Sequence, residues 1–161
     1  MANWAYGKVE IIGKFNGIRK FFEEELYHPD METEDWVKIS DNKIEVVLDY
    51  QDQVYVWFRH LKRSHISNCD MYVNDMHSRV IERSANDDPI SVHFTWCEAA
   101  WSWDDIKLAE ISGMYNLEII VHAEEPNMAF RQFIHVKDGK VLEFNEEDIS
   151  EDDESEEIYD D

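Results

Sequence analysis

Three histidines have a spacing that could place a metal site on a β-sheet. His93, His122 and His135 each fall opposite the apolar residues of an alternating segment, so neighbouring strands would bring their imidazoles to one sheet face. Three imidazoles can hold a zinc ion. The simpler interpretation is three unrelated histidines on a polar face, because no His-x-x-x-His or paired-cysteine spacing accompanies them. We therefore expect neither a metal nor a cofactor.

The two cysteines are candidates for a nucleophile. Cys97 stands beside Glu98, and Cys69 follows His65 in the sequence. A reactive thiolate needs an electropositive setting that lowers its pKa, and Cys97 lies among a tryptophan and carboxylates, so a buried structural thiol is the better interpretation. Gly-rich phosphate loops, G-x-S-x-G and H-E-x-x-H are absent from the sequence. We predict that the chain is not an enzyme and rank catalysis below two binding functions.

Carboxylates are the most abundant reactive groups of the chain. Its formal net charge is −22, and residues 145–161 hold eleven carboxylates without one Lys or Arg, which leaves −11 on residues 1–144. Affinity for nucleic acid depends on Lys and Arg neutralising phosphates, so direct nucleic-acid binding is not expected. Clustered carboxylates can instead imitate phosphates and accept bidentate hydrogen bonds from arginine. The alternatives are a merely solvated face and an acidic tail that only keeps the chain soluble.

The candidate partner-binding residues are acidic pairs and nearby tryptophans. Glu124 and Glu125 are preferred, because they follow a strand in a loop closed by Pro126, where a sheet edge could project them. Asp104 and Asp105 also suit the first turn of a helix, which gives them a structural explanation. The full set is Glu23, Glu24, Asp87, Asp88, Asp104, Asp105, Glu124 and Glu125, with Trp101 and Trp103 as exposed aromatic anchors.

An aromatic strand followed by basic residues keeps RNA binding as an alternative. Tyr55 and Trp57 share one strand face and could stack bases, and a basic cluster at 59–63 follows them. The acidic body would repel a phosphate chain. The cluster could instead pair with the chain's own acidic surface, in one copy or in a homodimer.

Apolar periodicity divides the chain into strands and two helices. One helix is capped by Asn16 and stopped by Pro29, and a second is capped by Ser102 and runs to about Gly113. Residues 61–88 show only short apolar islands. Strands are predicted at 4–13, 35–39, 43–50, 53–60, 90–97, 117–123, 130–136 and 140–144. In the strand over 90–97, strict alternation puts Trp96 on the face of Phe94 and Cys97 on the other face.

This order predicts an α+β fold, with a mainly antiparallel sheet, two helices on one face and extra strands. Residues 1–144 form one domain, in which 27–88 are a divergent excursion, and residues 145–161 form a mobile acidic tail. The expected core residues are Trp4, Ile11, Phe21, Phe22, Val92, Phe94, Ile106 and Ile119.

Several short motifs resemble the YubB-type ferredoxin-like family of plasmids and phages. They are Asn3-Trp4, Ala100-Trp101-Ser102, Tyr115-Asn116-Leu117, Glu124-Glu125-Pro126 and the Met-Ala-Phe segment at 128–130. The resemblance is strongest over about 1–26 and 89–144. It implies a ferredoxin-like sandwich and an origin on a mobile element, and it brings no enzymatic activity.

The sequence therefore predicts an acidic inhibitor that binds a basic nucleic-acid-handling host protein, such as a defence nuclease, in the manner of anti-CRISPR or anti-restriction proteins. The alternative is a protein-interaction or assembly module that uses the Tyr55–Trp57 face. A cytoplasmic location is expected, because no leader and no apolar run of membrane-spanning length is present.

Overall fold

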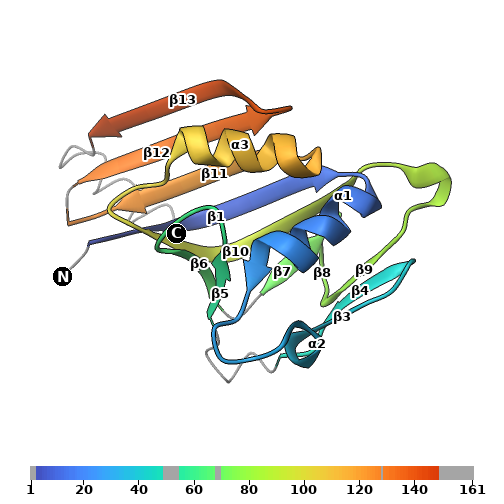
Figure 1. The fold of residues 1–161 in the computed structure, drawn as a ribbon. Helices are drawn as coiled ribbons and strands as arrows, with labels where there is room; N and C mark the ends of the chain where they lie inside the picture. Colours follow the sequence, from blue (N-terminus) through green and yellow to red (C-terminus); the bar gives the residue numbers. More distant parts are fainter. Residues whose placement is uncertain (1–2, 49–54, 68–69, 128, 149–161) are drawn as a thin grey trace.

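The computed structural model describes residues 3–48, 55–67, 70–127 and 129–148 of the chain (Figure 1). The first half contains β1 (Trp4–Gly13), α1 (Phe15–Lys20), the π-helical turn η1 (Phe21–Glu25), β2 (Leu26–Tyr27), α2 (Thr33–Trp36), β3 (Val37–Ile39), β4 (Lys43–Val46), β5 (Tyr55–Phe58), β6 (Ser64–Ser67) and β7 (Met71–Val73). The second half contains β8 (Met76–His77), β9 (Val80–Glu82), the 3-10 turn η3 (Ala85–Asp87), β10 (Ile90–Ala100), α3 (Asp105–Tyr115), β11 (Glu118–Glu125), β12 (Phe130–Lys137) and β13 (Lys140–Asp148). None of the described helices is long and apolar enough to cross a membrane.

A large antiparallel sheet dominates the molecule, and β1 lies inside it. The strand order is β13-β12-β11-β1-β10-β6-β5-β2, and β7 and β8 extend from β10. Both β10 and β11 are antiparallel to β1, so they run parallel to each other with β1 between them. The connection through α3 therefore passes over β1, as in a split β-α-β unit. The predicted α+β class with a mainly antiparallel sheet is confirmed.

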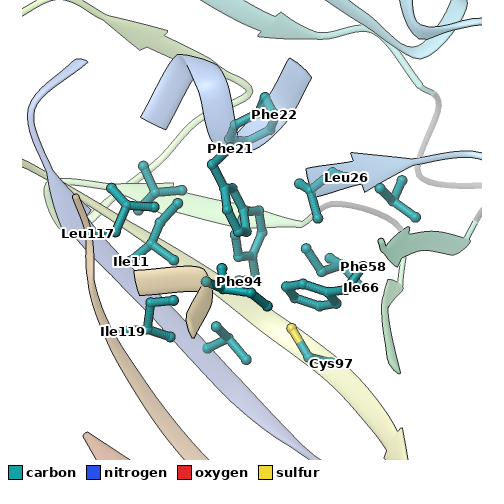
Figure 2. Close-up of a cluster of buried hydrophobic side chains, with 14 of the residues drawn as sticks. Ile11, Phe21, Phe22, Leu26, Phe58, Ile66, Phe94, Cys97, Leu117 and Ile119 are labelled. Carbon is teal, nitrogen blue, oxygen red and sulfur yellow. The ribbon is translucent and has the colours of Figure 1, made fainter. Parts of the chain in front are cut away.

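The core lies between one face of this sheet and the helices. Helices α1 and α3 cover the same face in Figure 1. Figure 2 shows the buried cluster to which Phe21, Phe22 and Phe94 belong, and the Phe22 ring lies 6.1 Å from that of Phe94 on β10. A small second sheet of order β3-β4-β9 joins this core through Trp36, whose ring lies 6.3 Å from that of Phe22. Six of the eight expected core residues are buried: Ile11, Phe21, Phe22, Val92, Phe94 and Ile119.

A β-bulge in β10 overturns the predicted faces of Trp96 and Cys97. Val9 pairs with Phe94 and Gly7 pairs with Cys97, so Thr95 and Trp96 together face the single residue Lys8. An extra residue in one strand inverts the alternation beyond it. Cys97 consequently lies in the core beside Phe94 (Figure 2), whereas Trp96 is 45% exposed on the other face.

The second helix begins later than the sequence suggests, which corrects the prediction for Ile106. Asp104, not Ser102, is the N-cap, because its side-chain Oδ1 accepts a hydrogen bond of 3.0 Å from the Lys107 backbone. The helix ends at Tyr115, followed by Asn116 in the left-handed conformation. In this register Leu108, Ala109 and Ile111 face the sheet and Ile106 is 59% exposed. Trp4 is half-buried and not a core residue.

Other predicted boundaries also differ from the structure. The strand expected at 35–39 begins as the helix α2, and η1 ends at Glu25 before a two-residue strand, so Pro29 does not stop a continuous helix. Strand β13 continues to Asp148 and pairs with β12 throughout, so residues 145–148 belong to the sheet and not to a tail. Residues 149–161, where the rest of the predicted tail falls, lie outside the described residues.

The two sides of the β10–α3 unit give a direct stability test. Phe94→Ala should lower the free energy of unfolding by about 3–5 kcal/mol, because it leaves a cavity in the fully buried core. Ile106→Ala should change it by less than about 0.5 kcal/mol, since Ile106 faces solvent. Urea unfolding of both variants measures the difference. Equal losses would mean that the helix is packed in the register predicted from the sequence.

Candidate partner-binding face

None of the described helices covers the other face of the large sheet. Along β1, β10, β11 and β12 every second residue is buried toward the helices, and the alternate residues are half-buried or exposed. We call this surface the open face. It carries Tyr6, Lys8, Glu10, His93, Trp96, Glu98, Ile120, His122, Glu124, Arg131, Phe133 and His135.

The bulge places an ordered tryptophan on the open face. The Trp96 ring stacks on Tyr6, with 4.7 Å between the ring centroids and 17° between the planes. Its Nε1 donates a hydrogen bond of 3.2 Å to Oε1 of Glu98. Beside the bulge, Gly7 lets β11 approach β1, because a Cβ there would collide with the carbonyl oxygen of His122 on β11. Glycine at such a place marks close backbone approach.

A buried histidine supports Glu98 from the neighbouring strand. His65 on β6 is only 4% exposed, and its Nε2 lies 2.8 Å from Oε2 of Glu98. The rings of Trp4, Tyr55 and Trp57 surround the imidazole at centroid distances of 5.3, 4.5 and 4.7 Å. Burial lowers the pKa of His65, although Glu98 acts in the opposite direction. A neutral imidazole that donates from Nε2 leaves Nδ1 bare, and this atom has no hydrogen-bond partner among the described residues.

A shallow groove of about 1190 Å³ extends from the Trp96 stack across the open face. Its aromatic wall contains Tyr6, Trp96 and Phe133, and its charged residues include both signs. Arg131 lies 3.5 Å from Glu147 of β13, and the exposed Lys8 lies beside the stack. The groove can therefore hold a flat cation or an extended polar segment, and its rings are positioned before binding.

The three histidines of the metal hypothesis all lie on the open face, but on separate partners. His93 contacts the Tyr72 ring, His122 contacts the Phe133 ring at 4.8 Å, and His135 pairs with Glu118. Strand β1 lies between β10 and β11, which separates His93 from the other two. Within the described residues, no group of three His, Cys, Asp or Glu side chains could hold a metal ion.

The split crossover brings the preferred pair, Glu124 and Glu125, and the second pair, Asp104 and Asp105, to one end of the sheet. The loop at 101–105 follows the last residue of β10, and Glu124 lies at the end of β11, opposite Tyr6. Trp101 and Asp104 are exposed at this end. This juxtaposition depends on β10 and β11 being parallel, which the sequence alone does not show.

Two residues of the predicted set are buried, which corrects their assigned roles. Trp103 lies in the core, where its Nε1 donates to the Ala5 carbonyl at 3.2 Å and its backbone N–H donates to Gln132 at 2.9 Å. Glu125 is fully buried, because β11 lies inside the sheet and this position alternates toward the helices. Neither residue can be an exposed anchor.

The remaining acidic candidates lie elsewhere. Glu23 forms an ion pair with Arg19 at 2.8 Å on the exposed side of the first helix. Asp87 lies 3.6 Å from Arg83 and 4.0 Å from Lys14, near the opposite end of the sheet, where Asp88 is exposed. Glu24 is exposed, and its carbonyl accepts a hydrogen bond from Arg59. The eight acidic candidates therefore do not form one surface.

The basic cluster at 59–63 contacts the end of the first helix through Glu25, a residue outside the predicted partner-binding set. This carboxylate is fully buried and accepts hydrogen bonds from the His60 backbone N–H at 2.6 Å and from the Tyr115 hydroxyl at 3.1 Å. His60 Nδ1 also lies 2.6 Å from it. Burial and the nearby Glu25 raise the pKa of Tyr115. Arg59 and His60 are therefore part of the framework.

Sequence reasoning missed Tyr6, His65 and Glu98 as members of one constellation. The bulge in β10 brings these residues together, but β10 contains no Gly or Pro that would indicate a bulge. The residue in the sequence that could have indicated it is Gly7 on the neighbouring strand. A search of family models, curated proteins and solved structures found no match to this chain.

The buried histidine predicts an acid-sensitive stability. The unfolded chain should take up a proton at position 65 near pH 6.5, whereas the folded chain resists it because burial lowers the pKa of His65. The free energy of unfolding should therefore fall as the pH falls below about 6.5. Urea unfolding at several pH values should show a smaller loss in His65→Gln, which keeps an N–H donor for Glu98 without titrating. An unchanged pH dependence in this variant would contradict the assignment.

Proposed function

We propose that this chain is a non-enzymatic acidic inhibitor that binds a basic nucleic-acid-handling protein by imitating the charge of nucleic acid. The observation that carries the proposal is the gathering of carboxylates at one end of the sheet. Strand β13 brings Glu146, Glu147 and Asp148 to the end of the sheet where Asp104 and Asp105 begin α3. We call these five residues the acidic end. In the sequence, residues 149–161 follow Asp148 and contain eight more carboxylates.

The acidic end borders a hollow that is lined by charges of both signs. Asp104, Asp105 and Glu146 line one hollow of about 820 Å³ between the start of α3 and β13. Arg59, Lys62 and Lys107 line it too, and Lys107 is paired with Glu110 at 3.3 Å. The two signs are thus balanced in the hollow, and Glu147 and Asp148 at the end of β13 add further carboxylates beside it. Duplex DNA carries about one charge per 1.7 Å of axis, so such a dense carboxylate run suits an arginine- or lysine-lined groove.

The fold supports the finer part of the proposal. The order β11-β1-β10-β6, with α3 crossing over β1, is compatible with a ferredoxin-like core enlarged by extra strands. The resemblance to the YubB-type family of plasmids and phages belongs to the same proposal. It makes a host defence nuclease the natural target, in the anti-CRISPR or anti-restriction manner, and the host cytoplasm the place of action.

A second candidate is a protein-interaction or assembly module whose acidity only maintains solubility. The exposed aromatic rings of Trp96 on the open face and of Tyr55 on β5 favour it. The two functions differ in their response to salt. Binding driven by carboxylates weakens as salt rises, whereas contact through aromatic surface changes little.

Charge reversal at the acidic end tests the inhibitor proposal. Asp105→Lys with Asp148→Lys should reduce retention of basic nucleic-acid-binding proteins from a bacterial lysate by at least about tenfold, because steering and pairing charges are lost. Added duplex DNA, or a rise from about 50 to 200 mM salt, should release the same proteins from the wild type. Immobilised protein and mass spectrometry give the measurement.

Asp88→Lys with Glu82→Lys is the matched control. It makes the same change in net charge at exposed positions away from the acidic end. Equal losses in both double variants would mean that net charge alone matters and that the acidic end is no binding site. If partner proteins are still retained in high salt, with added DNA and by both charge-reversed double variants, the assembly module is favoured.

A further inference from the structure

The Trp96 indole is exposed and yet held in one orientation. The Tyr6 ring supports one of its faces, and Glu98 accepts the hydrogen bond from Nε1. A side chain that is already ordered loses little conformational entropy on binding, and such aromatic residues dominate the energy of many interfaces.

A carboxylate stands next to this ring. Glu98 accepts from Trp96 through Oε1 and contacts His65 through Oε2, and its side chain remains 23% exposed. A carboxylate offers about four acceptor positions, so it can accept a further N–H. Because burial lowers the pKa of His65, that imidazole is neutral at pH 7 and does not cancel the negative charge of Glu98.

We propose that the open face binds an arginine-rich segment of the basic partner, with one guanidinium stacked on Trp96 and hydrogen-bonded to Glu98. This inference rests on the proposed function and names the contact that would accompany the acidic end. A guanidinium is planar, stacks on aromatic rings and donates to carboxylates, which matches both groups at this place. The groove that continues toward Phe133 has room for the neighbouring residues of the segment.

Charge complementarity favours a basic peptide over a nucleic acid on the same rings. Single-stranded RNA or DNA also stacks on exposed aromatic residues, but it needs a positively charged track for its phosphates. The stack has Glu98 and Glu124 beside it, and the chain carries a net charge of −22. Lys8 also lies beside the stack, but Arg131 is paired with Glu147, so the described lining of the groove does not form a continuous basic track.

Two synthetic peptides, nona-arginine and nona-lysine, test the proposal by calorimetry at low salt on the full chain. Trp96→Ala should lower the affinity for nona-arginine by about tenfold and the affinity for nona-lysine by less than about threefold, because a guanidinium stacks on an aromatic ring better than an ammonium does. Met114→Ala is the control, since Met114 is also 45% exposed but lies on α3, on the covered side of the sheet. The indole N–H resonance of Trp96 should shift with nona-arginine and should keep its position with an RNA oligouridylate.

Failure of this inference differs from failure of the proposed function. If wild type and Trp96→Ala bind nona-arginine equally, or the wild type does not bind it, the arginine site is wrong, whatever the acidic-end variants show. Oligouridylate binding that depends on Trp96 would also overturn it, in favour of a nucleic-acid surface. The proposed function fails on a separate result, the insensitivity of partner retention to salt, DNA and charge reversal.

Trp96→Phe, which keeps an aromatic ring, should recover part of the affinity for nona-arginine that Trp96→Ala loses.

Discussion

The pairing of β1 on both of its edges is the constraint on which the rest of the structure depends. Because β10 and β11 both pair with β1, the connection through α3 crosses over β1, and α3 packs on the same face as α1 (Figure 1). Gly7 lets β11 approach at the place where β10 contains its bulge. The bulge turns Cys97 into the core and Trp96 out of it, so one backbone irregularity shapes both the core and the open face.

A buried carboxylate completes the framework on the helix side. Glu25 at the end of η1 contacts the turn after β5 through His60 and contacts α3 through Tyr115. A buried carboxylate is costly unless it is well hydrogen-bonded, and here it has partners from two other elements. This contact also engages part of the basic cluster at 59–63, which the sequence alone leaves open as an RNA-binding element.

The acidic end and the Trp96 stack adjoin each other. Tyr6 pairs with both Glu98 and Glu124 near the start of β1, and the loop at 101–105 lies just beyond the end of β10. A basic partner could thus meet carboxylates at the end of the sheet and an ordered aromatic ring on its open face. The carboxylates would supply long-range attraction, and the ring would supply short-range contact with little dependence on salt.

The sequence by itself determined the strand-rich α+β class, most of the core and the acidity, since these follow from periodicity and composition. Phe21, Phe22 and Phe94 are buried as their spacing indicates. Only the tertiary structure decided the faces of Trp96, Trp103 and Glu125, because these depend on neighbours distant in the chain. The bulge of β10 forms against β1, Trp103 is held by Ala5 and Gln132, and β11 lies between β1 and β12. The same holds for the His65–Glu98–Trp96 constellation: its members come from two strands whose register depends on backbone pairing, and local residue pattern does not encode that register.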